Sequence, residues 1–301
     1  MPSTAQKTPP PPPLGTIVDD GSGALELVSV LGCGGYGVVY RARDLKVSYP
    51  CYYAVKCLVR PTANLNSRQR QLHLREIALH QLASPHRNVV AIHRVIDPPH
   101  SPYTFIVMDY CPDGDLFTMI LHNRRYLGRD SLIKHVFLQL LDAVEYCHSL
   151  GIYHRDMKPE NVLCINNGLD LAVTDFGLAT TDKLSSEFRT GSVYHMSPEC
   201  QGGAFAPSGN YSPPANDIWS LGIILLNLCT GRNPWKSATA NDPTFSAYLA
   251  SPSDFLPSVL PISQQLNAIM TGVLAIDWKR RTSLKEFKEK EAWHAAHGKL
   301  A

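Results

Sequence analysis

A run of polar residues near the middle of the chain has the composition of a catalytic loop. It reads Tyr153-His-Arg-Asp-Met-Lys-Pro-Glu-Asn161, and the shorter motif Asp175-Phe-Gly177 follows it. Phosphoryl transfer needs a group that orients the attacking hydroxyl, and divalent cations that neutralise the transferring oxygens. Asp156 has the side chain expected of the hydroxyl-positioning base. Asn161 and Asp175 supply the oxygen ligands that magnesium prefers.

Lys158 lies just beyond Asp156, from where its ammonium can reach a γ-phosphate during transfer. Short apolar segments that we expect to be strands, Ile152–His154 and Leu171–Val173, lead into the two motifs. We therefore expect loops that expose polar side chains above a packed base. The two motifs in this order indicate phosphoryl transfer far more specifically than either motif alone.

A glycine cluster precedes these motifs. Leu31-Gly-Cys-Gly-Gly-Tyr-Gly-Val-Val39 fits the pattern GxGxxGxV. Glycines allow a hairpin to pass close to phosphates, where a side chain would collide and backbone N–H groups can reach oxygens. The pattern alone does not identify the type of site, because a dinucleotide-binding turn shares it. In that turn, however, a helix would begin within the motif. Here Val38 and Val39 continue as a strand, which favours the hairpin.

The next strand carries a lysine, in Ala54-Val-Lys56. A lysine inside an apolar strand costs free energy unless its charge is paired. Glu76, midway along an expected helix over 67–83, is the natural partner, and the ammonium would then bridge to the α- and β-phosphates. The alternative is a surface lysine with a solvated glutamate, which the downstream motifs make much weaker.

The elements around these motifs change character along the chain. The expected strands of the first part are Leu25–Val30, Tyr52–Leu58, Val89–Ile96 and Tyr103–Tyr110. The expected helices of the second part are Ser131–Ser149, Asp217–Cys229, Leu266–Leu274 and Leu284–Ala295. This pattern predicts an α+β, bilobal fold: a small antiparallel sheet with one main helix, then a larger and mostly helical lobe.

The domain limits follow from the same pattern. We expect a domain over 24–296, divided into an N-lobe (24–108), a hinge (109–115) and a C-lobe (116–296), with a short tail at 297–301. Residues 1–23 are expected to be a disordered, proline-rich tail, because Pro9–Pro13 lack the N–H groups that helices and sheets need. This tail is either a plain leader or a ligand for an SH3 or WW domain.

Composition narrows the class of protein. A formal net charge of +2 provides no basic field, so nucleic-acid binding is not favoured. Eight scattered cysteines form no zinc or disulfide pattern, which is typical of reduced thiols in the cytoplasm or nucleus. The longest apolar run, around Leu221–Leu226, is far shorter than the ~20 residues that span a bilayer, so no membrane partner is expected. We expect a monomer.

On these motifs the chain resembles the eukaryotic protein kinase family over about residues 26–296. The resemblance implies ATP and Mg²⁺ as cofactors and proteins as substrates. Lys158 and Gly191-Ser192 indicate the serine/threonine type. The segments 175–181 and 188–201 are similar to fungal kinases linked to nutrient response and to repression of meiosis.

The resemblance also assigns roles residue by residue. Met108 matches the gatekeeper, Asp109 to Cys111 the hinge that bonds adenine, and Asp115 the ribose contact. The full implied ATP-binding set is Leu31, Gly32, Gly34, Gly37, Val39, Ala54, Lys56, Met108, Asp109, Cys111, Asp115 and Leu163. Two further implied roles are structural: Glu199 of Ser197-Pro-Glu199 should pair with Arg281, and Asp217 should secure the catalytic loop.

Four residues are implied on the substrate and activation side: Ser192, Glu160, Arg155 and Thr190. Arginines placed like Arg155 often clamp a phosphate, yet Phe188 occupies the usual phosphothreonine position. Glu187 beside it is expected to supply a standing negative charge, which predicts basal activity without an upstream kinase. Asp115 and Glu160 hint at basic substrates.

His80 departs from the family pattern, because an apolar residue usually stands there in a column of side chains. We expect a packed histidine satisfied by a neighbour; the alternative is a proton switch that loosens the helix. Two other classes compete with an active protein kinase. A pseudokinase would lack one of Lys56, Asp156, Asn161 or Asp175, and a small-molecule kinase would lack the elements at 191–199.

Overall fold

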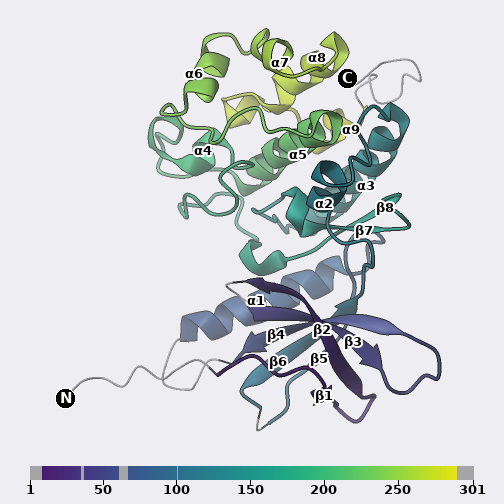
Figure 1. Ribbon diagram of the computed structural model, residues 1–301. Helices are drawn as coiled ribbons and strands as arrows, with labels where there is room; N and C mark the ends of the chain where they lie inside the picture. The colour runs from purple at the N-terminus through teal and green to yellow at the C-terminus, as the bar shows by residue number, and fades with distance from the viewer. Residues whose placement is uncertain (1–8, 35–36, 61–66, 100, 290–301) are drawn as a thin grey trace. The chain divides into compact units, whose positions relative to one another are not determined.

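The computed structural model describes residues 9–34, 37–60, 67–99 and 101–289 (Figure 1). These residues form two compact units. The first comprises the chain up to Pro85 together with Val90–Cys111, and the second comprises His86–Val89 and the chain from Pro112 onward. The main division therefore falls inside the segment predicted to be the hinge. Within the described residues, no helix is long and apolar enough to cross a membrane.

The first unit is an antiparallel sheet with one helix, as predicted. The strands follow the order β1-β2-β3-β4-β6-β5. Their bounds are β1 Ile17–Val18, β2 Leu25–Gly34, β3 Gly37–Asp44, β4 Tyr52–Val59, β5 Ile92–Ile96 and β6 Tyr103–Asp109, and the helix is α1 Ser67–Ala83.

The two faces of β4 explain how this sheet positions Lys56. Side chains alternate between the faces of a strand. Val55 and Cys57 are buried in a cluster that includes Leu27 and Tyr40. Lys56 therefore lies on the opposite face, in register with Val39 of β3 and Ile106 of β6. The apolar cluster thus fixes the strand while Lys56 points away from it.

The segment predicted to be a disordered tail is different in the structure from Pro9 onward. Ile17–Val18 forms β1 and pairs antiparallel with β2. Pro12 and Val18 are both buried. A proline run has no N–H groups to pair, but its carbonyls still accept hydrogen bonds, and the sheet provides donors for them. Residues 1–8 of the expected tail lie outside the described residues.

The second unit is mostly helical. Its helices are α2 Leu116–Leu121, α3 Asp130–Ser149, α4 Pro198–Gln201, α5 Pro213–Thr230, α6 Pro243–Ala250, α7 Phe255–Val259, α8 Gln264–Val273 and α9 Leu284–Glu289, and its strands are β7 Val162–Ile165 and β8 Asp170–Val173. Short 3₁₀ turns occur at Pro159–Asn161, Phe176–Leu178, Gly203–Phe205 and Trp278–Arg280.

Helix α5 is the centre of this unit, and α3 packs against it. Every residue from Ala215 to Thr230 is buried. The helix begins four residues before the predicted start, because Ser212 caps it and Pro213 occupies its first turn. A side chain at Gly222 would approach Val273 of α8 to 2.6 Å, so this contact requires glycine.

The structure differs from the prediction at two other segments. Ile152–His154, predicted to be a strand, contributes only the single bridge between Tyr153 and Thr180. Its polar groups bond to a helix and to neighbouring loops instead, so no ladder extends. The helix predicted over 284–295 is described as α9 up to Glu289, and the remainder lies outside the described residues.

Candidate active site

The residues predicted to act on ATP are distributed over both units. In the first unit Lys56 and Glu76 form an ion pair, with Nζ and Oε1 separated by 2.5 Å. Both side chains are buried, Lys56 at 9% and Glu76 at 4% exposure. A buried charge is strongly unfavourable without a partner, so each residue depends on the other. The predicted pair is therefore formed, from the middle of β4 and the middle of α1.

The glycine-rich segment forms the hairpin between β2 and β3. Gly34 pairs with Gly37, and the two intervening residues, Gly35 and Tyr36, lie outside the described residues. Gly37 has φ of 138°, and a Cβ there would come within 2.2 Å of the carbonyl oxygen of Cys57. Only glycine fits this close approach of two strands. Leu31, Gly32 and Gly34 are exposed at this end of the sheet.

The end of β6 carries the predicted gatekeeper and hinge residues. Met108 and Cys111 are buried. The Asp109 carboxylate is taken up within the unit, because it bonds His93 Nε2 at 2.7 Å and accepts from the Ala91 amide at 3.2 Å. The backbone groups of Asp109 are therefore the ones that we expect to make the predicted nucleobase contact.

In the second unit, Asp217 of α5 supports the catalytic loop. Its Oδ2 accepts from the His154 amide and its Oδ1 from the Arg155 amide, each at 2.8 Å. His148 Nε2 also contacts Oδ2, at 2.9 Å. Arg155 has φ of 67°, an uncommon backbone conformation for a residue with a side chain. The hydrogen bonds that these two backbone amides donate to the fully buried carboxylate hold the loop in that conformation.

Asp156 lies at the tip of this loop with its two carboxylate oxygens in different environments. Oδ2 accepts from Lys158 Nζ at 2.7 Å and from Asn161 Nδ2 at 3.0 Å. Oδ1 has no hydrogen-bond partner among the described residues, although it is buried. A buried oxygen without a partner costs free energy and calls for a functional explanation. A hydrogen-bond donor is the ligand that this oxygen lacks.

Asp175 follows β8 and also has a left-handed backbone, with φ of 64°. The next residue, Phe176, is buried with its ring 5.1 Å from that of His154. His154 in turn bonds the carbonyl of Thr174 at 3.0 Å, and Thr174 donates its amide to the carbonyl of Asn161 at the same distance. The two predicted metal-binding segments are therefore tied together through their backbones.

The donor set suits magnesium held jointly with a nucleotide. Asn161 uses its amide nitrogen on Asp156, so its amide oxygen is the group that remains for a cation. Among the described residues, no cluster of three or more His, Cys, Asp or Glu side chains could hold a metal ion by itself. Magnesium in such enzymes takes one or two protein oxygens and completes its shell with phosphate and water. Asn161 and Asp175 fit that requirement.

Asp115 and Leu163 complete the predicted ATP-binding residues of this unit. They form an isolated antiparallel bridge with each other. Asp115 also caps α2, where its Oδ1 accepts from the Thr118 amide at 2.7 Å. We therefore expect the other carboxylate oxygen of Asp115 to make the predicted ribose contact.

Comparison with known proteins agrees with this geometry. Residues 25–293 match the protein kinase domain family. The chain belongs to the protein kinase family. The fold class and the family predicted from the sequence are confirmed. The family generally uses ATP and magnesium.

Three fungal relatives indicate the type of kinase. The chain is 43% identical over 291 residues to "Negative regulator of sexual conjugation and meiosis" of Schizosaccharomyces pombe, which covers 91% of this chain and 60% of that protein. It is 33% identical over 318 residues to Serine/threonine-protein kinase VHS1 of Saccharomyces cerevisiae, covering 86% and 68%. Serine/threonine-protein kinase SKS1 of the same yeast is 41% identical over 231 residues, covering 73% and 45%. These relatives assign the domain to the serine/threonine kinases.

Arg155 forms an ion pair with Glu187, the residue predicted to supply a standing negative charge beside Phe188. Arg155 Nη1 lies 2.7 Å from Glu187 Oε2, and Arg155 Nε donates to the carbonyl of Leu178 at 2.6 Å. The Arg155 side chain is 6% exposed and that of Glu187 is 58% exposed. Phe188 packs against Tyr211 and the buried cluster around Met196 and Cys200, which explains an apolar residue at this position.

The predicted substrate-side residues lie along the same segment. A Cβ at Gly191 would come within 2.4 Å of the Arg155 carbonyl and 3.3 Å of Asp156 Oδ1, so this glycine passes directly beside Asp156. Ser192 follows it and accepts two turn hydrogen bonds with its carbonyl. Thr190 donates its hydroxyl to the carbonyl of Glu187 at 2.7 Å. Glu160 is exposed.

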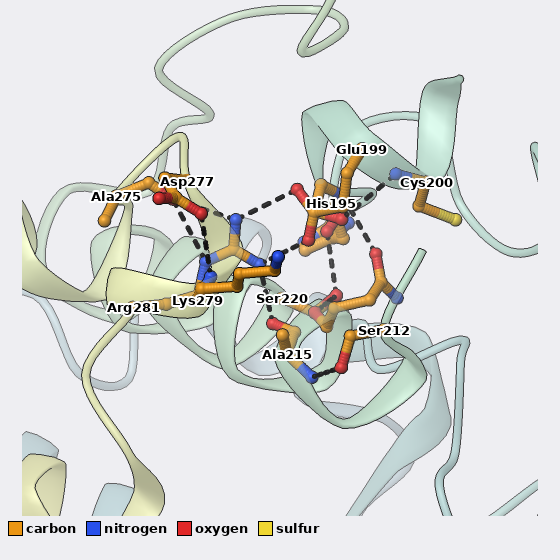
Figure 2. Close-up of polar contacts among 12 residues, drawn as sticks. His195, Glu199, Cys200, Ser212, Ala215, Ser220, Ala275, Asp277, Lys279 and Arg281 are labelled. Atoms are coloured by element: carbon orange, nitrogen blue, oxygen red, sulfur yellow. Dashed lines mark hydrogen bonds and ion pairs between the residues drawn. The ribbon is translucent and has the colours of Figure 1, made fainter. Parts of the chain in front are cut away.

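The predicted pair of Glu199 and Arg281 is present and doubly bonded, with N–O distances of 2.6 and 3.0 Å (Figure 2). The side chains are 0% and 1% exposed. Arg281 also donates to the carbonyls of Ala215 and Ala275, and its guanidinium lies over the Trp219 ring. Removing one partner from such a buried pair typically costs about 3–5 kcal/mol.

The sequence did not predict one buried pair of residues near the candidate site. His195, which is buried in the activation segment, bonds Asn227 of α5 between Nε2 and Oδ1 at 3.0 Å. Asn227 uses its amide nitrogen on the Arg232 carbonyl and on Asn233. Burial lowers the pKa of His195 to about 4. No local signal marks this pair, because its members are far apart in the sequence.

His80, the residue that departs from the family pattern, is a packed histidine in the first unit. It is 3% exposed, and its Nε2 lies 2.7 Å from the carbonyl oxygen of Val90. This contact agrees with a histidine satisfied by a neighbour.

Proposed function

We propose that the whole protein is an active serine/threonine kinase that transfers the γ-phosphoryl group of magnesium-bound ATP to hydroxyls of protein substrates. The observation that carries this proposal is the carboxylate of Asp156. One of its oxygens is fixed by Lys158 and Asn161, and the other is left without a partner among the described residues. An inactive scaffold has no need for that arrangement.

In the first unit, Lys56 is the proposed phosphate-binding cation. Its ion pair with Glu76 holds the ammonium at one position, so that binding loses little further side-chain entropy. The glycine hairpin presents backbone N–H groups to the phosphates. Val39, Ala54 and the segment from Met108 to Cys111, which starts at the end of β6, are the proposed nucleobase contacts.

In the second unit, Asp156 Oδ1 accepts the hydrogen bond of the substrate hydroxyl and orients its oxygen for attack. Lys158 balances the charge on the same carboxylate at Oδ2 and lies where it can also meet the transferring phosphate. Asn161 and Asp175 are the proposed metal ligands. Magnesium supplies neutralisation of the charge on the phosphate oxygens.

Two alternatives are weaker on specific grounds. A pseudokinase would lack one of the four residues Lys56, Asp156, Asn161 or Asp175, and the sequence contains them all. A small-molecule kinase has no use for a peptide-binding segment. Here Gly191 lies beside Asp156, and Glu199 of the same segment forms a buried ion pair with Arg281.

The location and pathway are also proposals. The eight cysteines are scattered along the sequence without disulfide or zinc spacing, which supports a reducing compartment such as the cytoplasm or nucleus. The relative named "Negative regulator of sexual conjugation and meiosis" supports a role in the control of that developmental choice. We also propose that residues 24–296 form the kinase domain, on which residues 9–18 pack.

A phosphorylation assay tests the proposed activity. The purified chain is incubated with labelled ATP, magnesium and a generic basic protein, with Asp175→Ala as the matched inactive control. We expect label on the protein that requires magnesium and is lost in Asp175→Ala. Transfer only to small molecules, or no transfer by the wild type while ATP still binds, would contradict the proposal.

A further inference from the structure

The proline run and the strand after it form one continuous strap on the sheet of the first unit. We define the strap as residues 9–18. Pro12 and Val18 are its buried residues, and Val18 belongs to the same apolar cluster as Tyr40 and Leu27. The strap therefore contributes to the core of the unit.

Two tyrosine hydroxyls of the sheet recognise the proline carbonyls. Tyr40 of β3, itself 1% exposed, donates to the carbonyl of Pro12 at 2.8 Å. Tyr103 of β6 donates to the carbonyl of Pro10. A run of prolines offers acceptors and apolar ring faces but no N–H donors. A surface that recognises it must present donors among aromatic rings, which is how proline-binding domains work.

A turn then directs the strap onto the edge of the sheet. The Thr16 amide bonds the Pro13 carbonyl at 3.2 Å, and Gly15 between them has φ of 83°. That conformation favours glycine at the third position of a tight turn. Beyond the turn, the Gly15 amide bonds the Leu27 carbonyl at 2.8 Å, and the Leu27 amide bonds the Thr16 carbonyl at 3.0 Å.

The strap acts on the strand that leads into the glycine-rich hairpin. Without β1, strand β2 would be the edge of the sheet, with unpaired backbone groups. Just beyond the strap, Asp20 forms an ion pair with Arg94 of β5 at 2.8 Å. Strands β1 and β5 are the two ends of the sheet order, so this pair links its opposite edges.

We propose that Tyr40 and Tyr103 form a proline-binding groove that the chain's own strap occupies. Occupation steadies β2, and thereby the glycine hairpin, and so strengthens ATP binding. It also withholds the proline run from SH3 and WW domains. The consequence for ATP rests on the proposed kinase function, whereas the groove and its occupant do not.

The test uses the full chain and a double variant, Tyr40→Phe with Tyr103→Phe, which removes the two hydroxyls and keeps both rings. Tyr49→Phe is the matched control, because Tyr49 is 66% exposed. Three quantities are measured: hydrogen exchange of the Gly15 and Leu27 amides, the KM for ATP, and binding to an SH3 domain. That SH3 domain is chosen because it binds the free peptide of residues 9–16.

In the wild type and in Tyr49→Phe we expect slow exchange, and SH3 binding at least roughly tenfold weaker than to the free peptide. In the double variant, exchange should accelerate by roughly tenfold or more, since two hydrogen bonds are lost. SH3 binding should then approach that of the peptide, and the KM for ATP should rise roughly threefold with kcat unchanged.

Equal exchange rates in the double variant and in Tyr49→Phe would overturn the groove, as would wild-type SH3 binding as tight as that of the peptide. Faster exchange with an unchanged KM would overturn the link to ATP. A wild-type chain that lacks kinase activity but keeps slow exchange would contradict the proposed function and leave the groove intact.

Discussion

Two buried aspartates of the second unit, Asp217 below the catalytic loop and Asp156 at its tip, have the same side chain in opposite states. Asp217 is 0% exposed, and each of its oxygens accepts a backbone N–H bond. Asp156 is 8% exposed, and only its Oδ2 has partners among the described residues. The first carboxylate is saturated by the fold, and the second is half satisfied.

The two aspartates therefore differ in role: Asp217 supports the loop, whereas Asp156 is proposed to act in the reaction. A saturated carboxylate lowers the free energy of one loop conformation, here one with a strained Arg155 backbone. An oxygen left open inside a folded loop costs stability, and the cost is offset when a ligand arrives. Substitutions at Asp217 should therefore affect stability and activity together, whereas substitutions at Asp156 should affect activity alone.

The largest effect is expected at Asp156. Asp156→Asn keeps the shape but replaces one carboxylate oxygen by an N–H donor and removes the charge that draws the hydroxyl proton. We expect kcat to fall by about 10²–10⁴-fold, the usual contribution of a positioned base. Tm should stay within about 2 °C of the wild type. A variant with normal kcat, or one that unfolds, would contradict the proposed difference in role between Asp156 and Asp217.

The next effect is expected at Asp217. Asp217→Asn sets an amide donor against one of the two backbone N–H groups that the carboxylate binds. We expect the free energy of unfolding to fall by about 2–4 kcal/mol, because a buried charge-assisted bond is lost and a donor is left unpaired. Thermal melting checks this, and kcat should fall as well. A stable Asp217→Asn protein with reduced kcat would show that this aspartate acts in catalysis rather than in support.

The third prediction concerns His195 beside the same loop. Burial lowers its pKa from 6.5 to about 4. Between these values the unfolded chain binds the proton and the folded chain does not, so stability falls as the pH falls. The contribution lost on going from about pH 7 to about pH 5 is about 2 kcal/mol.

The measurement is urea unfolding at the two pH values for the wild type and for His195→Asn, which cannot titrate there. His73 and His86, whose pKa values burial also lowers, titrate in both proteins and cancel in the difference. An identical pH dependence in the two proteins would rule out His195 as the source.

The smallest effect is expected at Glu187, because its side chain is 58% exposed and its pair with Arg155 is screened by water. Glu187→Gln should lower kcat by about two- to fivefold, as expected for an exposed ion pair. Phosphatase treatment should leave wild-type activity in place, because Glu187 already supplies the charge. Complete loss of activity after that treatment would contradict this role.

The sequence predicted the site where neighbouring residues carry the chemistry. Asp156, Lys158 and Asn161 share one short loop, so their contacts follow once the loop is identified. The Lys56–Glu76 pair was also predictable, because an apolar strand cannot hold an isolated ammonium.

Contacts between distant side chains could not be predicted in the same way. The hydrogen bond from Tyr40 to Pro12 spans 28 positions, and neither residue type indicates that the other is its partner. The tail was therefore expected to be disordered. Likewise, the turn of the Asp109 carboxylate toward His93 depends on the register of β5 and β6, which the pattern of apolar residues does not fix.

The most direct test of the account is mass spectrometry of a protein mixture phosphorylated by the wild type and by Asp156→Asn, with magnesium and ATP binding measured on both. The account predicts phosphoserine and phosphothreonine from the wild type, normal ATP binding by both proteins, and almost no phosphorylation by the variant. Phosphotyrosine as the main product, or equal phosphorylation by the two proteins, would contradict it.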